Sequence, residues 1–385
     1  MQKSLLPFKA YYFFIFAALA FLAPFLTLYY EGLGLSGRQI GILAAIPSLV
    51  TFISAPIFGL VTDVTQRHKL ILGGALLVVV ASVILLSTLR SFTGLILGVI
   101  LYAFTFAPTL PIIDRSVLEV LGAQREKYGR QRLWGAIGWG ISAPIAGYVV
   151  AAAGLSWAFY GGAVLFLVLF LVALLTPIQK VRIQGNYWAG ITALISDRQV
   201  VVFFGVMLVG GMGLASVHHY LYLYLDHLGA STVTMGYSLS IATVSEVLVM
   251  FFADRLLRRW KARGMILIGM LMIVLRLVGY AIAPTPQAAL AFQVLHGPTF
   301  AAIWLAGIAY LSEIAPPGLG NTAQGLFTGV VMGLGSSFGA FGGGFLYQGM
   351  GFSVMFLVMA GCVFVAGVSF LVLSRSDAAD QPEEV

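Results

Sequence analysis

Three side chains that can carry a charge lie deep inside long apolar runs in the second half of the chain: Glu246, Arg276 and His296. Counted at about 1.5 Å per residue, each lies roughly 12–18 Å from an end of its run. A carboxyl group and an imidazole can bind and release protons, and an ionisable group in an apolar segment usually faces a cavity or a partner. This trio indicates proton transfer, and a purely structural Glu246–Arg276 pair is the alternative.

A second pair of charges, Asp114 and Arg132, lies in the first half at equal distances before and after the centre of a predicted turn. Two antiparallel helices joined by that turn would bring both residues to a similar depth. Side chains of opposite charge at a similar depth can form an ordinary salt bridge. Pro108 and Pro111 predict a distorted helix before Asp114, which affects that depth.

The composition defines the environment in which these charges lie. The chain has 385 residues, of which 60% are hydrophobic and 9% charged, and its mean hydropathy is +0.99. Soluble domains are about a quarter charged, so a soluble globular protein is excluded. The single cysteine, Cys362, cannot form an internal disulfide. Phosphate-loop, serine-hydrolase and zinc-protease motifs are missing, which predicts a protein that is not an enzyme and needs no cofactor or metal.

Twelve apolar runs are separated by charges, prolines or Gly/Ser turns. Most have about 20 residues, the length that a helix needs to cross about 30 Å of hydrocarbon. The runs are continuously apolar rather than alternating, which excludes a β-barrel. We therefore predict an all-α integral membrane protein with twelve transmembrane helices. The runs are Phe8–Tyr30, Ile40–Thr62, Leu70–Leu89, Phe92–Leu121, Leu133–Ala153, Trp157–Thr176, Val200–Leu225, Met235–Ala253, Met265–Ala283, Ala288–Ser312, Ala323–Tyr347 and Phe352–Ser374.

The basic residues predict the orientation of the chain. The net charge is +7, and most of the 21 Lys and Arg residues fall on one side of the membrane if the N-terminus is inside. The positive-inside rule expects this asymmetry, which explains the excess of positive charge better than nucleic-acid binding does. Both termini are therefore predicted to be cytoplasmic.

The sequence also repeats itself. The segment Leu33–Gly41 recurs as Leu228–Gly236, and the motif Asp-x-x-x-Arg at Asp63 recurs at Asp254. Six helices per copy is an even number, so both copies have the same orientation. The predicted organisation is a six-helix bundle at 1–176, a cytoplasmic linker at 177–199, a second six-helix bundle at 200–375 and a cytoplasmic tail at 376–385.

Two parallel six-helix bundles are the organisation of the major facilitator transporters, which the chain resembles over essentially its whole length. The segment Gly59–Lys69 is similar to the superfamily's cytoplasmic signature, with Gln66 where glycine is usual. The resemblance implies a cytoplasmic gate, since an acidic residue at a helix end can pair with basic residues nearby. A generic positively charged loop is the alternative. The implied gate residues are Asp63, Arg67, Lys69, Asp254 and Arg258.

The segment Tyr128–Trp139 resembles the start of helix five in the branch that contains the lactose and phenylpropionate permeases. The sequence departs from the sugar permease at Thr299, where that protein has a second carboxylate, and at Glu246, which is displaced by about one turn. The resemblance implies substrate binding by Asp114, Arg132 and Trp139, and proton coupling by Glu246, Arg276 and His296.

These features together predict a secondary active transporter that takes up a small organic solute with protons by alternating access around a site between the bundles. An aromatic or other organic acid is the first expected substrate, with a sugar or a nucleoside as alternatives. A proton-antiport efflux pump is a further alternative. The expected partners are the solute, protons and the lipid bilayer of the cell inner or plasma membrane, without nucleic acid, and the expected functional unit is a monomer.

Overall fold

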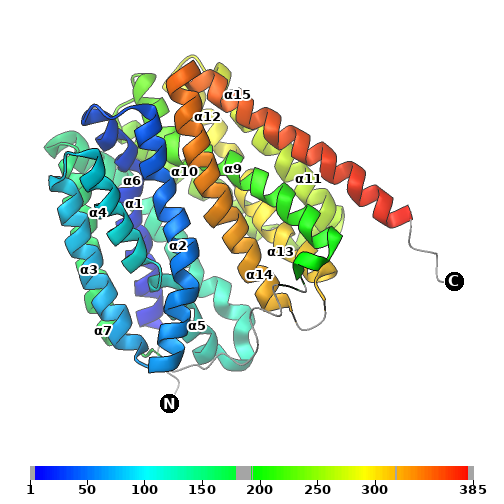
Figure 1. Cartoon of the computed structure of the whole chain (residues 1–385), viewed down its shortest axis with the longest axis horizontal. Helices are drawn as coiled ribbons and strands as arrows, with labels where there is room; N and C mark the ends of the chain where they lie inside the picture. Colours follow the sequence, from blue (N-terminus) through cyan, green and yellow to red (C-terminus); the bar gives the residue numbers. More distant parts are fainter. Residues whose placement is uncertain (1–4, 179–191, 193, 317–318, 380–385) are drawn as a thin grey trace. The chain divides into compact units, whose positions relative to one another are not determined.

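The structure is a computed structural model that describes residues 5–178, 192, 194–316 and 319–379, and within these ranges it contains helices and no strand. A helix satisfies its own backbone N–H and C=O groups, which is why apolar chains without access to water form helices. Figure 1 shows these helices in chain order. They are α1 (Leu6–Gly32), α2 (Gly37–Thr65), α3 (His68–Thr88), α4 (Phe92–Phe106), α5 (Thr109–Leu121), η1 (Gly122–Lys127), α6 (Tyr128–Ala153), α7 (Ser156–Leu175), α9 (Arg198–His227), α10 (Thr232–Phe251), α11 (Ala253–Ile282), α12 (Pro286–Ala291), η2 (Phe292–Leu295), η3 (Gly297–Ala301), α13 (Ala302–Ile314), α14 (Gly320–Thr328), η4 (Gly329–Gly335) and α15 (Ser336–Ala379).

Eleven helical stretches in the described part of the chain are long and apolar enough to cross a membrane. Large apolar side chains cover their outer surfaces, including Leu70 and Leu97, which are 68% and 65% exposed. The longest stretch, Thr322–Leu373, has 52 residues and combines the last two predicted runs. Its helix α15 is interrupted at Gly351, where φ is +81°, and the α15 ribbon turns back on itself from orange to red (Figure 1). The count of twelve crossings stays a prediction.

The junction between α1 and α2 and the junction between α9 and α10 have the same backbone geometry. Gly34 and Gly229 both adopt the left-handed conformation, with φ of +79° and +82°. The N–H group of each donates to the carbonyl three residues earlier at 2.8 Å. Ser36 and Ser231 directly precede the next helices and cap them. Each hydroxyl accepts from the N–H group three residues later, at 3.4 and 3.2 Å. The sequence repeat is therefore also a repeat of local structure.

Contacts within the chain divide it into two compact units, and residues 221–243 belong to the first unit together with α1 and α6. The His227 imidazole lies 3.0 Å from the Glu31 carboxylate, and the Ser240 hydroxyl donates to the Gly140 carbonyl at 2.7 Å. The second copy of the repeat therefore contributes the C-terminal part of α9 and the N-terminal part of α10 to the first unit. The first unit comprises 1–184 and 221–243, and the second comprises 185–220 and 244–385.

The sequence predicted bundles at 1–176 and 200–375. These boundaries differ from the division by contacts and stay a prediction. Most of the predicted linker 177–199 and the end of the tail 376–385 lie outside the described residues.

The fourth and tenth predicted spans are interrupted helices. In the fourth, α4 ends at Phe106 and α5 begins at Thr109, at the prolines that predicted a distortion. In the tenth, the 3-10 turn η2 and the π turn η3 flank His296 between α12 and α13. Irregular backbone within a membrane is tolerated only where it is buried in protein or lines a cavity, so both breaks mark positions where polar side chains can gather.

The backbone conformation at Gln66 explains why glycine is usual at this position of the cytoplasmic signature. It follows the end of α2 with φ +54° and ψ 22°, and its N–H group donates to the Thr62 carbonyl at 2.9 Å. This left-handed cap is strained for residues with a Cβ atom and costs glycine little.

We expect Gln66→Val to destabilise the protein by about 1–2 kcal/mol relative to Gln66→Gly, because a β-branched residue is the least suited to this conformation. Thermal unfolding in detergent measures the difference. Thr65→Val is the matched control, since Thr65 is the last helical residue of α2. Equal unfolding temperatures for the valine and glycine variants at position 66 would contradict the assigned conformation.

Candidate functional site

Two adjacent tyrosines of α1 attach this helix to α5 and position Asp114. The Tyr12 hydroxyl donates to Asp114 Oδ1 at 2.5 Å, and the Tyr11 hydroxyl donates to the Thr109 carbonyl at 3.1 Å. Both tyrosines are completely buried. A hydrogen bond to a carboxylate is shorter and stronger than one between neutral groups, so Tyr12 fixes the orientation of the acidic side chain.

Arg132 on α6 lies against the same region of α1. Its guanidinium carbon is 4.8 Å from the centre of the Phe16 ring and 5.5 Å from that of the Tyr12 ring. Aromatic faces attract cations, which explains how this charge is held next to apolar residues. Its Nη1 atom is nevertheless buried and has no hydrogen-bond partner in the part of the chain that the structure describes. A buried donor without an acceptor costs free energy, so a ligand oxygen that accepts from Nη1 would bind favourably.

Asp114 and Arg132 share Tyr12 instead of contacting each other. Between these two described side chains there is no ion pair; Asp114 binds the Tyr12 hydroxyl, and Arg132 covers the Tyr12 ring. The alternative of a simple salt bridge is therefore not what the structure contains. Trp139 is half-buried and follows Arg132 by about two turns of α6, roughly 10 Å along the helix. Tyr12 thus links the two predicted charges, and Trp139 lies on the helix that carries Arg132.

A second polar cluster surrounds Arg276 on α11, whose side chain is only 3% exposed. All of its hydrogen-bond acceptors are neutral groups, and Thr299 is among them. The second carboxylate of the sugar permease is thus replaced here by a hydroxyl that bonds Arg276. The acceptors are the Tyr280 hydroxyl at 3.1 Å, His296 Nδ1 at 3.1 Å, Thr299 Oγ1 at 3.2 Å and Gln293 Oε1 at 2.6 Å.

His296 lies between Arg276 and Glu246. A guanidinium can only donate, so His296 Nδ1 must be the acceptor and its proton must be on Nε2. This tautomer is assigned from the hydrogen-bond network. Nε2 lies 3.6 Å from the Glu246 carboxylate. The direct Glu246–Arg276 pair considered from the sequence is therefore replaced by a chain of three residues with a neutral histidine in the middle.

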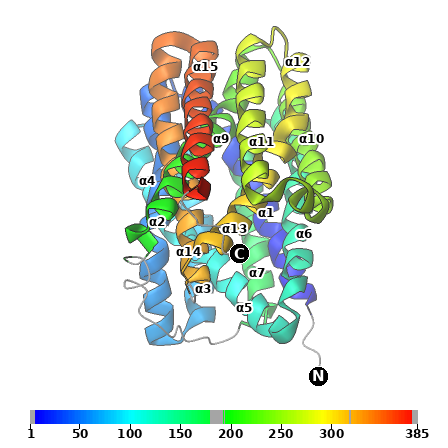
Figure 2. The ribbon, with the colours of Figure 1, turned by 90° about the vertical axis from the view of Figure 1, so that its right-hand side faces the viewer.

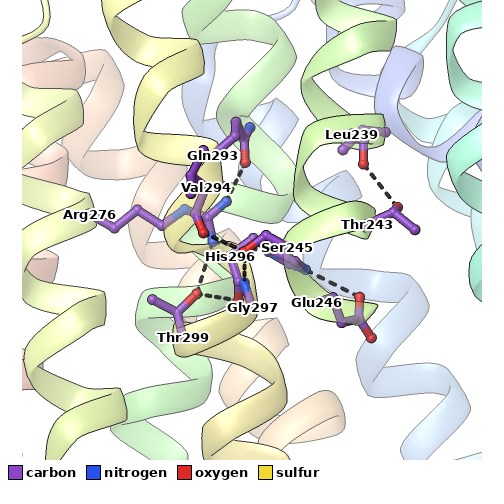
Figure 3. A network of polar contacts seen from close by, with 10 residues as sticks. All are labelled: Leu239, Thr243, Ser245, Glu246, Arg276, Gln293, Val294, His296, Gly297 and Thr299. Carbon is purple, nitrogen blue, oxygen red and sulfur yellow. Dashed lines mark hydrogen bonds and ion pairs between the residues drawn. The ribbon is translucent and has the colours of Figure 1, made fainter. Parts of the chain in front are cut away.

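Ser245 satisfies the backbone where Pro298 interrupts the helix. Figure 3 shows the Ser245 side chain beside Val294 and Gly297. Proline has no N–H group, so the Val294 carbonyl one turn earlier lacks its helical partner. The Ser245 hydroxyl donates to that carbonyl and accepts from the Gly297 N–H group at 3.1 Å. A Cβ atom on Gly297 would lie 2.2 Å from the Ser245 carbonyl oxygen, so only glycine fits. The break thereby fastens α10 to the turns that carry His296, with Glu246 next to Ser245.

The described side chains of the predicted gate do not form a hydrogen-bonded cluster like those around Tyr12 and Arg276. The Asp63 side chain lies outside the part of the structure that is described. The Lys69 ammonium group donates to the Leu174 carbonyl at 2.5 Å, and the other gate residues are exposed. With one another, the described gate side chains form no ion pair, and their gating role stays a prediction. The exposed residues are Arg67, Asp254 and Arg258.

Several residues of both clusters were not predicted from the sequence. The Gly297-Pro298 dipeptide directly after His296 is a signal for a break inside a span, and it could have pointed to Ser245 as the side chain that satisfies it. Tyr12 had no such signal, because one tyrosine among many aromatic residues is not distinctive. The residues that were missed are Tyr12, Ser245, Tyr280, Gln293 and Gly297.

Interrupted membrane helices, a repeated arrangement and polar clusters buried within each unit define a multi-pass membrane transporter. The chain belongs to the MFS_1-like family of the major facilitator superfamily, whose pattern matches residues 5–358. Its relatives are transporters and not enzymes.

Two relatives and one solved structure illustrate the similarity. The maltose permease of Geobacillus stearothermophilus is 25% identical over 381 residues, covering 96% of this chain and 94% of the permease. The probable 3-phenylpropionic acid transporter of Escherichia coli K12 is 26% identical over 364 residues, covering 91% of this chain and 92% of that protein. The crystal structure of the nucleoside transporter NupG (D323A mutant) matches with a TM-score of 0.85 at 20% identity, over 96% of this chain and 99% of NupG. That last match concerns the fold alone.

Proposed function

We propose that this transporter takes up a small organic acid, most suitably an aromatic one, together with protons by alternating access. The observation that carries the proposal is the buried Nη1 atom of Arg132, which has no acceptor among the described residues. A substrate carboxylate supplies that acceptor, and the half-buried Phe16 ring lies beside the guanidinium, where an aromatic group could pack against it. The similarity to the probable 3-phenylpropionic acid transporter supports the same class of substrate.

Proton coupling is assigned to Glu246 and His296. Their side chains are 18% and 26% exposed, and a carboxyl group and an imidazole can each bind and release a proton. Glu246 binds one proton and becomes neutral, which removes its attraction to the Nε2–H group of His296. Arg276 stays hydrogen-bonded to neutral acceptors in both states. One proton therefore changes the contact between α10 and the turns around His296 without breaking the arginine's own bonds.

A sugar is the second candidate substrate. Asp114 is a carboxylate that can accept a hydrogen bond from a sugar hydroxyl, and the maltose permease is a relative over nearly the whole chain. A nucleoside is the third, suggested by the fold similarity to NupG. Proton-antiport efflux is the alternative direction of transport.

The proposal includes a topology. The two limbs of α15 count as separate crossings, which gives twelve, an even number that places both termini on one side. The excess of basic residues on that side supports a cytoplasmic location for both termini. The proposal further includes a monomer in the inner or plasma membrane.

We expect purified protein in vesicles with an alkaline interior to accumulate 3-phenylpropionate above the external concentration, by about tenfold per pH unit for one proton per substrate. Thermal-shift screening of 3-phenylpropionate, maltose and uridine selects the labelled substrate, and a protonophore should abolish its accumulation. If only maltose or only uridine stabilises the protein and is taken up, that compound is the substrate instead of the acid. Equilibration that ignores the pH gradient would replace symport by facilitated diffusion. Reduced accumulation in cells that overproduce the protein would indicate efflux.

A further inference from the structure

The first eight residues of α11, 253–260, form a helical segment that is separate from the rest of the helix. Lys261 interrupts α11 with φ +54° and ψ 169°, a conformation that residues other than glycine rarely adopt. Figure 2 shows the first turns of α11 at an angle to the rest of the helix. Lys261 therefore divides α11 into a short first segment and the longer helix that follows.

The second copy of the repeat is longer than the first at this point. In the first copy the residue with positive φ, Gln66, comes three positions after Asp63, whereas in the second copy Lys261 comes seven positions after Asp254. Four extra residues are about one helical turn. The repeat motif alone does not require this turn, so its side chains call for a separate explanation.

Basic side chains occupy one face of the segment. Arg258 and Arg259 follow Arg255 by three and four residues, which places both on the same side of the helix as Arg255. All three are exposed, and so is Lys261, which follows them. Asp254 is the only acidic residue between positions 253 and 261. The face therefore presents a concentrated positive charge.

Aromatic side chains flank this charge. Phe251 is 79% exposed, and Phe252 and Trp260 are 40% and 43% exposed. The Arg255 guanidinium lies 5.7 Å from the centre of the Phe252 ring, and the Arg259 guanidinium lies 5.8 Å from that of Trp260. Exposed tryptophan and phenylalanine next to basic residues are typical of segments that lie at the interface between lipid headgroups and acyl chains.

We propose that residues 251–261 form an interfacial binding surface for anionic phospholipid headgroups. The arginines bind the lipid phosphate, and guanidinium groups suit this role because they donate two parallel hydrogen bonds. Phe251 and Trp260 insert beside the glycerol and upper acyl region. Each basic residue near an anionic membrane surface contributes roughly a fivefold preference. This surface lies outside the proposed substrate and proton sites and does not depend on the identity of the substrate.

The test uses the complete protein in phosphatidylcholine vesicles that contain a small fraction of brominated phosphatidylglycerol, which quenches nearby tryptophan fluorescence. The difference between the wild type and Trp260→Phe isolates the signal of Trp260. We expect brominated phosphatidylglycerol to quench Trp260 at least tenfold more effectively than brominated phosphatidylcholine. The triple variant R255Q/R259Q/K261Q, which leaves the predicted gate residue Arg258 in place, should lose most of this preference.

The matched control K127Q/R130Q/R198Q removes the same charge from other segments on the predicted cytoplasmic side and should keep the preference. Salt at about 1 M shortens the screening length to about 3 Å and should abolish the preference in the wild type, a result that does not require any variant to fold. Inorganic phosphate at millimolar concentration should not compete, because a lipid headgroup is held together with its acyl chains. A preference that survives in high salt or in R255Q/R259Q/K261Q, or that the control loses equally, would overturn the proposal.

Discussion

Arg132→Gln is expected to leave the protein folded in the membrane and to abolish uptake of the proposed organic acid. Among the described side chains Arg132 makes no ion pair and its Nη1 atom has no hydrogen-bond partner, so removal of the guanidinium loses its contacts with the Phe16 and Tyr12 rings but breaks no ion pair. The substrate carboxylate, in contrast, loses a charge-assisted bidentate contact. Loss of one partner from such a pair costs several kcal/mol, or roughly three decades of affinity.

Arg130→Gln is the matched control for this prediction, because Arg130 lies on the same helix and is exposed. Binding is measured by the thermal shift with substrate and transport by vesicle uptake. Normal uptake by Arg132→Gln would show that the buried guanidinium has only a packing role against Phe16 and Tyr12, and the proposed site would have to be abandoned.

Asp114→Asn extends the same experiment to the second charge and should also abolish uptake. The asparagine side-chain oxygen can still accept from the Tyr12 hydroxyl, so the contact between α1 and α5 remains. Only the negative charge is lost. Glu119→Gln, at an exposed position of α5, is the control. If Asp114→Asn accumulates substrate as the wild type does, its carboxylate serves only to orient Tyr12.

Glu246→Gln is expected to retain substrate binding and exchange but to lose accumulation against a gradient. A glutamine can accept from the His296 Nε2–H group and so preserves the local structure, but it cannot bind and release a proton. Exchange of internal for external substrate needs no net proton movement, whereas uphill transport does. The expected loss is the entire accumulation ratio, about tenfold per pH unit for one proton per substrate.

Counterflow and uphill uptake in the same vesicles separate these two steps for Glu246→Gln. Glu313→Gln, at an exposed position near the end of α13, is the matched control and should behave as the wild type. We expect Glu246→Gln to fold, because the hydrogen bonds of Arg276 go to neutral groups and none goes to Glu246. Undiminished uphill uptake would move the coupling role away from Glu246, and a misfolded variant would indicate that the chain through His296 is chiefly structural.

The helical class, the membrane environment and the repeat could be predicted from the sequence because they depend on local patterns. A run of about 20 apolar residues must satisfy its own backbone hydrogen bonds in lipid, which leaves the helix as its only solution. The junctions at Gly34 and Gly229 are likewise local, since a left-handed glycine followed by a serine cap ends one helix and begins the next. The prolines of the fourth span predicted its break for the same reason.

The partners of the buried charges were decided only by the tertiary structure. Spacing along the chain brought Asp114 and Arg132 to a similar depth, but it contained no information on Tyr12, which comes from a helix about a hundred residues earlier and separates them. In the second half, the sequence suggested a contact between Glu246 and Arg276. The break at Pro298 and its repair by Ser245 placed His296 between them instead. Hydrogen bonds act over about 3 Å, so the rotation and position of each helix determine which groups meet, and packing with distant segments fixes both.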